Sequence, residues 1–239
     1  MSCMRPFLFL GIGLAGFAGL RAAAAQFTSG PAQTALVELF SSEGCSSCPP
    51  AERWLGSLRA DPGLWRDFVP VAFHVDYWNR LGWPDRFSRR EFTAREYAYA
   101  AAWHSDSVYT PCVVRNGVEA KAGAGVLAPG RPAGRLTAAY DGVALRVEFS
   151  PPGPAEARSY EVHAAILGGG IVSRVTAGEN SGETLHQEFV ALILVHGAPG
   201  AEIALERPKA AGVSRQALAV WITRRGELTP LQATGGWLE

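Results

Sequence analysis

The sequence predicts a two-part fold, an α/β domain followed by a smaller, mainly antiparallel β-sandwich-like domain. In the first part, apolar runs typical of strands alternate with segments of helical spacing, which is the pattern of an α/β layer structure. A C-x-x-C motif at Cys45 and Cys48 separates the first such run from the first helical segment. After about residue 135, short alternating runs follow one another with glycine-rich turns between them, which favours antiparallel strands.

The C-x-x-C motif carries the main chemical prediction. It follows the apolar run 36–40 and precedes Pro49 and Pro50, which fit the first turn of a helix. Free N–H groups and the helix dipole stabilise a thiolate at that place. We therefore expect Cys45, as the more exposed thiol, to be the nucleophile and Cys48 to resolve the mixed disulfide. Strand, loop, C-x-x-C and helix in this order predict an α/β thioredoxin-like domain.

Further elements are predicted in the first half by local patterns. Residues 68–75 alternate as a strand, and Ser88 with Glu91 forms a capping-box pattern that predicts the start of a helix. Asn116 and Gly117 predict the turn of a β-hairpin.

The second half offers no pairing of a nucleophile with a base, so we expect a non-catalytic role for it. Its strands are expected at 143–149, 160–167, 171–175, 189–195, 203–206 and 218–223.

The N-terminus predicts export. A positive charge at Arg5, an apolar stretch over 7–20 and small residues at 23–25 are typical of a secretory signal peptide. The predicted organisation is thus a signal peptide over 1–25, a thioredoxin-like domain over 26–135 and a β-rich domain over 136–239. We expect the mature protein to be periplasmic or secreted.

Composition restricts the partners. The chain has 22 basic and 22 acidic residues, and removal of Arg5 and Arg21 with the signal peptide leaves a slight acidic excess. This balance predicts no nucleic-acid binding. No segment after the signal peptide has the length of a membrane span, so none is expected in the mature chain. The expected partners are the thiols and disulfides of other exported proteins.

Several motifs together resemble one bacterial family. They occupy residues 37–51, 72–79, 81–83, 92–95, 108–111 and 178–180. On these motifs the chain is similar to the domain of unknown function 1223 family, exported proteins whose N-terminal part is thioredoxin-like. The resemblance implies a fold and an export route, and it implies no substrate.

The resemblance also implies roles for particular residues. Thr110 and Pro111 match the loop that holds a cis proline opposite the C-x-x-C, where substrate backbone docks. Glu38 matches a buried carboxylate that accepts a proton from the resolving thiol; the alternatives are an exposed Glu38 or one paired with an arginine. Cys112 replaces an expected glutamine, and we consider an alternative disulfide with Cys45, an inert buried thiol and a metal ligand.

Three residues at the end of the second strand are candidates for a groove beside Cys45. His74 and Asp76 lie on one face of that strand, and Trp78 continues the series. The alternative is a His–Asp hydrogen bond that closes the strand end.

Three functions are consistent with these residues. The first is an exported thiol–disulfide oxidoreductase that uses Cys45, Cys48, Pro111 and Glu38 without a cofactor. The second is a copper chaperone or sensor in which Cys45, Cys48 and His74 bind copper(I). The third is a binding module with a structural disulfide.

Overall fold

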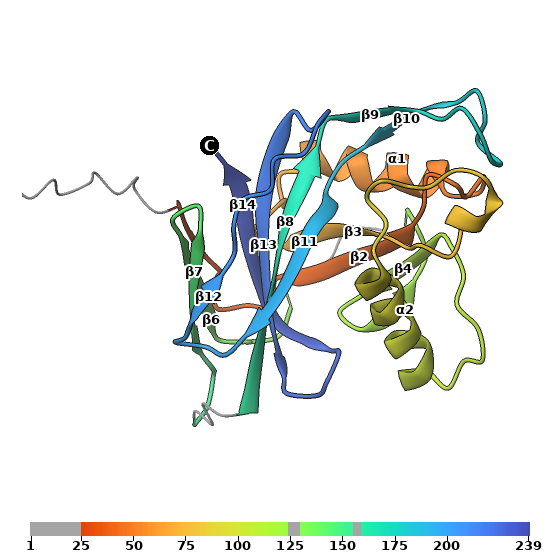
Figure 1. Cartoon of the computed structure of the whole chain (residues 1–239). Helices are drawn as coiled ribbons and strands as arrows, with labels where there is room; N and C mark the ends of the chain where they lie inside the picture. The colour runs from red at the N-terminus through yellow and green to blue at the C-terminus, as the bar shows by residue number, and fades with distance from the viewer. Residues whose placement is uncertain (1–24, 124–129, 155–158) are drawn as a thin grey trace, which may run out of the picture.

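The computed structural model describes residues 25–123, 130–154 and 159–239 (Figure 1). Two α-helices, α1 (Pro49–Ser57) and α2 (Arg90–Ala102), and two single 3-10 turns, η1 (Leu58–Ala60) and η2 (Asn79–Leu81), accompany a much larger set of strands. The strands are β1 (Ala25–Thr28), β2 (Ala35–Ser41), β3 (Phe68–His74), β4 (Cys112–Arg115), β5 (Val118–Ala120), β6 (Arg135–Tyr140), β7 (Ala144–Ser150), β8 (Tyr160–Gly169), β9 (Ile171–Arg174), β10 (Thr184–Gln187), β11 (Val190–Gly197), β12 (Glu202–Ala204), β13 (Arg215–Arg224) and β14 (Pro230–Leu238).

An eight-stranded sheet forms the centre of the molecule, in the order β14-β13-β8-β11-β3-β2-β4-β5. Within it β3 pairs in parallel with β2 and β11, and the other neighbours are antiparallel. The parallel pairing of β11 with β3 places Val190 opposite Ala72, whose N–H donates to the carbonyl of Phe189 at 2.8 Å. One sheet therefore contains strands from both halves of the chain (Figure 1).

The predicted fold class, an α/β thioredoxin-like domain followed by a smaller β-sandwich-like domain, is wrong. The described chain is mostly β and has only two α-helices among its described residues. The physical reason lies in β3, which is buried along its whole length and needs a hydrogen-bonding partner on each edge. β11 provides the second partner, so the later strands extend the first sheet.

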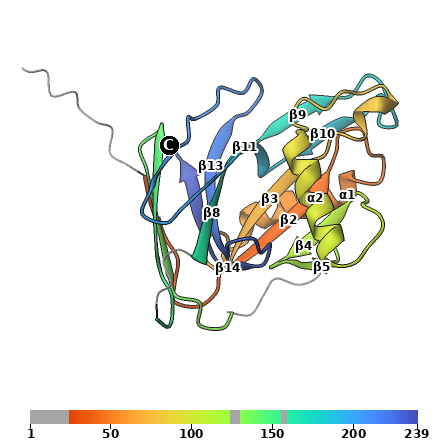
Figure 2. The same cartoon turned by 60° about the horizontal axis from the view of Figure 1, so that its bottom comes forward.

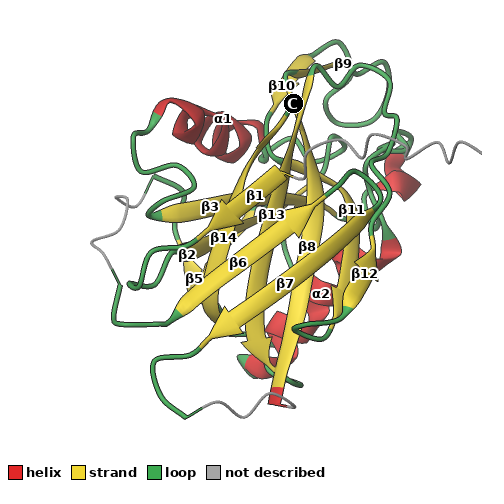
Figure 3. Cartoon of the chain, turned by 90° about the vertical axis from the view of Figure 1, so that its left-hand side faces the viewer, coloured by secondary structure: helices red, strands yellow, loops and turns green. Residues whose placement is uncertain are grey.

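A second sheet, in the order β1-β6-β7-β12, packs across β13 and β14 of the first. Figure 3 shows β6 and β7 crossing in front of the larger sheet, and Figure 2 shows the same strands as a separate layer. β9 and β10 form a two-stranded arm that lies beside α1.

The two helices lie on opposite faces of β2. Glu38 of β2 bonds to Arg95 of α2, whereas Ser41 bonds to Glu52 of α1. Side chains three residues apart on a strand point to opposite faces. Phe40, on the same face as Glu38, accordingly packs against Tyr99 of α2 at 6.1 Å between ring centroids. This arrangement decides which buried groups can reach the cysteines.

Most local predictions agree with the structure, with one exception. β2 and β3 cover the expected strands, and the hairpin of β4 and β5 turns at Asn116 and Gly117, both with positive φ. α2 begins at Arg90, two residues after the expected start at Ser88. The predicted capping box is wrong: the Ser88 hydroxyl donates to the carbonyl of Asp85 at 2.8 Å, and no side chain caps the helix. The predicted signal peptide lies, except for Ala25, outside the described residues.

No helix among the described residues is long and apolar enough to cross a membrane.

Candidate redox site

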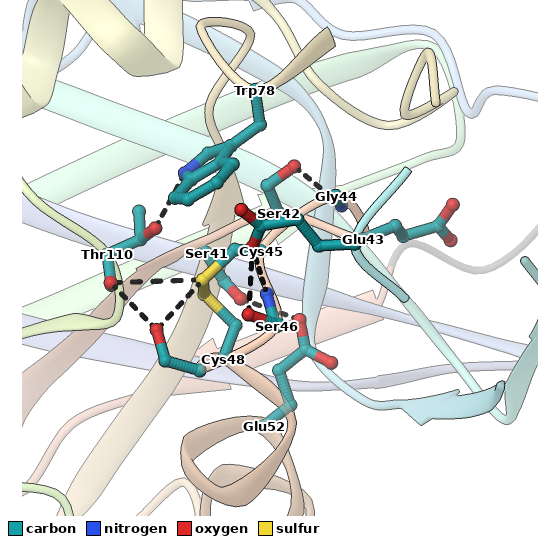
Figure 4. Close-up of a disulfide and its surroundings, with 12 residues drawn as sticks. Ser41, Ser42, Glu43, Gly44, Cys45, Ser46, Cys48, Glu52, Trp78 and Thr110 are labelled. Carbon is teal, nitrogen blue, oxygen red and sulfur yellow. Dashed lines mark hydrogen bonds between the residues drawn. A yellow bond between two sulfur atoms is a disulfide. The ribbon is translucent and has the colours of Figure 1, made fainter. Parts of the chain in front are cut away.

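Cys45 and Cys48 form a disulfide at the start of α1 (Figure 4). Their Cα atoms are 5.4 Å apart. Pro49 and Pro50 occupy the first turn of the helix, as the sequence predicted, and the carbonyl of Cys48 accepts the N–H groups of Ala51 and Glu52 at 3.0 and 3.1 Å. The motif therefore stands at the positive end of the helix dipole, where a thiolate is favoured.

Neither cysteine has accessible surface in the disulfide form. Both residues are 0% exposed, so the prediction that Cys45 is the more exposed thiol is wrong for this state. Ser46 and Ser47, between them, are exposed. A second thiol can reach a sulfur atom only if the surrounding chain moves.

The tip of the β9–β10 arm covers the motif. The side-chain amide of Asn180 donates to the carbonyls of Glu43 and Cys45, both at 2.9 Å. The Glu179 carboxylate accepts the N–H of Ser46 at 3.2 Å and its hydroxyl at 2.8 Å. These four hydrogen bonds fasten a segment from the second half of the chain to the backbone around Cys45.

Thr110 and Trp78 border the disulfide on another side. The Thr110–Pro111 peptide bond is cis. The Thr110 carbonyl oxygen lies 3.8 Å from Cys45 Sγ and 3.4 Å from the Ser47 hydroxyl, which also lies 3.3 Å from Cys45 Sγ. The Trp78 indole N–H donates to the Thr110 hydroxyl at 2.8 Å and so holds this loop in place (Figure 4).

Glu38 is buried, and it is paired with an arginine, which was one of the alternatives left open by the sequence. Arg95 Nε donates to Glu38 Oε1 at 2.6 Å, and the Tyr99 hydroxyl donates to Glu38 Oε2 at 2.5 Å. Burial alone would lower the pKa of Arg95, but the Glu38 carboxylate raises it, so the guanidinium stays charged. Glu38 faces α2, on the side of β2 opposite α1.

A different carboxyl group, Glu52, lies next to the cysteines. It is one turn after Cys48 in α1, is only 6% exposed, and accepts a hydrogen bond from the Ser41 hydroxyl at 2.6 Å. Figure 4 shows its side chain reaching from α1 toward Ser41, beside Cys48. Burial raises the pKa of Glu52, with a smaller opposing effect from the charge of His74. A carboxyl of this kind exchanges protons more readily near neutral pH.

His74 and Asp85 extend the buried charge on this face of the sheet. His74 Nδ1 lies 2.6 Å from Asp85 Oδ2, and neither side chain is exposed. Burial alone would lower the pKa of His74, but the Asp85 carboxylate raises it to about 9. Burial would likewise raise the pKa of Asp85, and the histidine lowers it. Asp76, the partner considered from the sequence, accepts instead from Thr93 at 2.6 Å.

Glu43 completes this group. Its Oε2 accepts the indole N–H of Trp83 at 2.8 Å, and its backbone N–H donates to Asp85 at 2.8 Å. Glu43 Oε1 and His74 Nε2 are buried and have no hydrogen-bond partner among the described residues.

Cys112 is a free, buried thiol at the start of β4. Burial raises its pKa to about 12, so it is protonated at neutral pH. Within the described residues there is no group of three or more histidine, cysteine or acidic side chains placed to hold a metal ion.

Sequence reasoning missed the roles of Glu52, Asp85, Glu179 and Asn180. The position of Glu52 beside Cys48 could have been predicted, because a residue four positions after Cys48 lies on the same face of the helix. The other three reach the site from segments whose pairing the sequence does not reveal.

Fold and site together define a β-rich protein with a buried disulfide at the N-terminus of a helix. Residues 36–223 match the family model described as "Protein of unknown function (DUF1223)", and the chain belongs to that family. The resemblance seen in the sequence is thereby confirmed as to family. No curated protein matches the chain.

Two solved structures are similar to this one. A protein of Agrobacterium tumefaciens, determined by X-ray crystallography, is 20% identical, with a TM-score of 0.59 over 87% of this chain and 94% of that one. HBP35 of Porphyromonas gingivalis is 12% identical, with a TM-score of 0.51 over 88% of this chain and 76% of that one. At these identities the likeness concerns the fold alone, and it extends across both halves of the chain.

Proposed function

We propose that this protein exchanges thiols and disulfides with other exported proteins through Cys45 and Cys48. The observation that carries the proposal is the position of the disulfide: it stands at the N-terminus of α1, with the Ser47 hydroxyl and the Thr110 carbonyl beside Cys45 Sγ. A helix N-terminus lowers the pKa of a thiol and makes it both a better leaving group and a competent nucleophile.

The exchange has two steps. A substrate thiolate attacks Cys45 Sγ, the Cys45–Cys48 bond breaks, and Cys48 leaves as a thiolate that takes a proton. A second substrate thiolate then attacks the substrate sulfur of the mixed disulfide and releases Cys45. Two substrate thiols become one disulfide, and the protein becomes a dithiol. The reverse sequence reduces a substrate disulfide.

In this scheme Glu52 supplies the proton to Cys48 and accepts it in the reverse direction. Its protonated form is favoured by burial, and it lies one helical turn from Cys48. Pro111 and Thr110 position the partner chain beside Cys45. Asn180 and Glu179 must release the motif first, because both cysteines are buried.

Insulin reduction by the mature protein with dithiothreitol tests the proposal. We expect a rate above that of dithiothreitol alone, retained in Cys112→Ala and lost in Cys45→Ala. The Cys112 variant is the matched control, because it removes a buried thiol outside the disulfide. A rate equal to that of dithiothreitol alone would reject catalysis by the motif.

Complete burial of the cysteines favours a second candidate, a binding module held by a structural disulfide. The reduction potential separates the two functions. Exchange-active pairs lie roughly between −120 and −270 mV, whereas structural disulfides lie below about −300 mV. Equilibration in glutathione buffers followed by alkylation of Cys45 and Cys48 measures this value.

A further inference from the structure

A cavity lies between α1 and the β9–β10 arm, away from the cysteines. It has a volume of about 400 Å³ and is lined near the end of α1 by Gly56 and, just beyond it, by Arg59. From the arm and the strands that follow come His186, Gln187 and Arg215. Figure 1 shows β9 and β10 lying along α1, so the arm that covers the disulfide at its tip forms one wall of this cavity at its base.

Gln187 is the unusual residue of this cavity. It is 2% exposed, yet its side-chain nitrogen and oxygen both have no hydrogen-bond partner among the described residues. A buried amide without partners destabilises a protein, because both groups have lost their hydrogen bonds to water and gained none in return. Because Gln187 lines the cavity, a turn of its side chain toward the cavity would let a ligand satisfy its donor and its acceptor together.

The charges around Gln187 are mainly positive. Arg53, Arg59 and Arg215 line the cavity, and the one carboxylate among its lining residues is Glu188. Glu188 is already occupied: it accepts the N–H of Gly170 at 3.1 Å, forms an ion pair with Arg215, and lies 3.7 Å from Arg59 Nε. Within the described chain Arg53 forms no ion pair, so the cavity keeps an excess of guanidinium groups.

We propose that this cavity binds a carboxylate that is carried beside an amide, as in an N-acylated amino acid or the C-terminus of a peptide. Guanidinium groups bind carboxylates through paired hydrogen bonds, and Arg53 is placed to supply them. The Gln187 amide pairs with the ligand amide, donating to its carbonyl and accepting its N–H. The site is separate from the disulfide and does not depend on the redox proposal.

Titration of the full mature protein with N-acetylglycine, followed by NMR at constant ionic strength, tests this site. We expect saturable shifts for residues of β10 and the end of α1. Arg53→Gln should weaken binding about tenfold, the loss expected for one charge-assisted hydrogen-bonded pair. Arg90→Gln is the matched control, because Arg90 is an exposed arginine of α2 outside the cavity, and it should leave the affinity unchanged.

Gln187→Leu separates a ligand-binding role from a structural one. It replaces an unpartnered amide with an apolar group of similar size, so the unliganded variant should unfold at the same or a higher urea concentration. Its affinity for N-acetylglycine should fall about tenfold. Affinity thus falls without any loss of stability, which no purely structural role of Gln187 produces.

Three results would overturn the proposal: shifts no larger than those from added sodium chloride, affinity retained in Gln187→Leu, or an equal response to inorganic phosphate. The last would show that the cavity does not distinguish a carboxylate beside an amide from any anion.

Discussion

Two clusters of buried charge lie on opposite faces of β2, and they differ in how completely their hydrogen bonds are made. Under α2, both oxygens of Glu38 are bonded, to Arg95 and to Tyr99. Under α1, near the disulfide, two buried polar atoms have no partner among the described residues: Glu43 Oε1 and His74 Nε2. We call the group of Glu38, Arg95 and Tyr99 the closed cluster, and the group around Glu43 and His74 the open cluster. The closed cluster holds one charge state, whereas the open cluster has groups free to exchange protons.

The comparison assigns different roles to two buried carboxyl groups, Glu38 and Glu52. Glu38 and Glu52 are both buried and both close to the C-x-x-C in the chain. Glu38 is fixed as the partner of a permanent cation, which suits a structural role. Among the described residues, the side chain of Glu52 has a neutral hydroxyl as its one hydrogen-bond partner, and burial raises its pKa, which suits proton transfer.

The largest expected effect on stability comes from removing the arginine that pairs with Glu38 in the closed cluster. Arg95→Met leaves the Glu38 carboxylate buried without its cation, and we expect the free energy of unfolding to fall by about 3–5 kcal/mol. Urea denaturation measures it. Arg90→Met, on an exposed position of the same helix, should change it by less than about 0.5 kcal/mol. Equal losses in the two variants would contradict a structural role for the Glu38–Arg95 pair.

The histidine of the open cluster should make stability depend on pH. The pKa of His74 is raised from 6.5 to about 9, so its contribution is fully present below pH 6.5 and is lost as pH rises through about 9. The loss is about 3 kcal/mol at most, since one pKa unit corresponds to about 1.4 kcal/mol. Comparing urea midpoints at pH 6 and pH 9.5 measures it.

The control for this pH dependence is a second histidine. His74→Gln should flatten the decline between pH 6.5 and 9, whereas His186→Gln, on an exposed position of β10, should leave it as in the wild type. A decline that persists unchanged in His74→Gln would show that other groups cause it.

Replacing Glu52 by glutamine should change the rate of disulfide reduction, whereas replacing Glu38 by glutamine should change stability. Glu52→Gln keeps an oxygen for the Ser41 hydroxyl but loses the titrating group, so we expect reduction of the disulfide by dithiothreitol to slow by about 10²-fold at neutral pH. Glu38→Gln should lower stability and leave the rate unchanged once the protein is folded. Stopped-flow tryptophan fluorescence follows the reaction; the reverse assignment of effects would place the proton on Glu38.

The sequence predicted the elements of the site better than their assembly. Local rules predict the start of α1 at Pro49 and Pro50 and the strand before the C-x-x-C motif, and the structure has both. The Thr110–Pro111 peptide bond is cis. The family was also recognisable from short motifs.

Long-range pairing is what the sequence did not reveal. Glu38 finds its cation 57 positions later, and Asn180 reaches the carbonyl of Cys45 across 135 positions. The junction of β11 with β3, which makes one sheet out of two expected domains, is of the same kind. Each depends on how strands pack after collapse, and nothing in the spacing of neighbouring residues encodes it.

The smallest expected effect concerns the tip of the β9–β10 arm, which is bonded to the backbone of Glu43 and Cys45 beside the open cluster. Asn180→Ala removes two hydrogen bonds to the carbonyls of Glu43 and Cys45 and should lower stability by about 1–2 kcal/mol. If the arm must leave before a thiol reaches Cys45, the same change should speed reduction of the disulfide about fivefold to tenfold, because local opening becomes easier. Glu183→Ala, exposed in the same loop, should do neither. A destabilised Asn180 variant with an unchanged rate would mean that thiols reach the sulfur from the Thr110 side, with the arm in place.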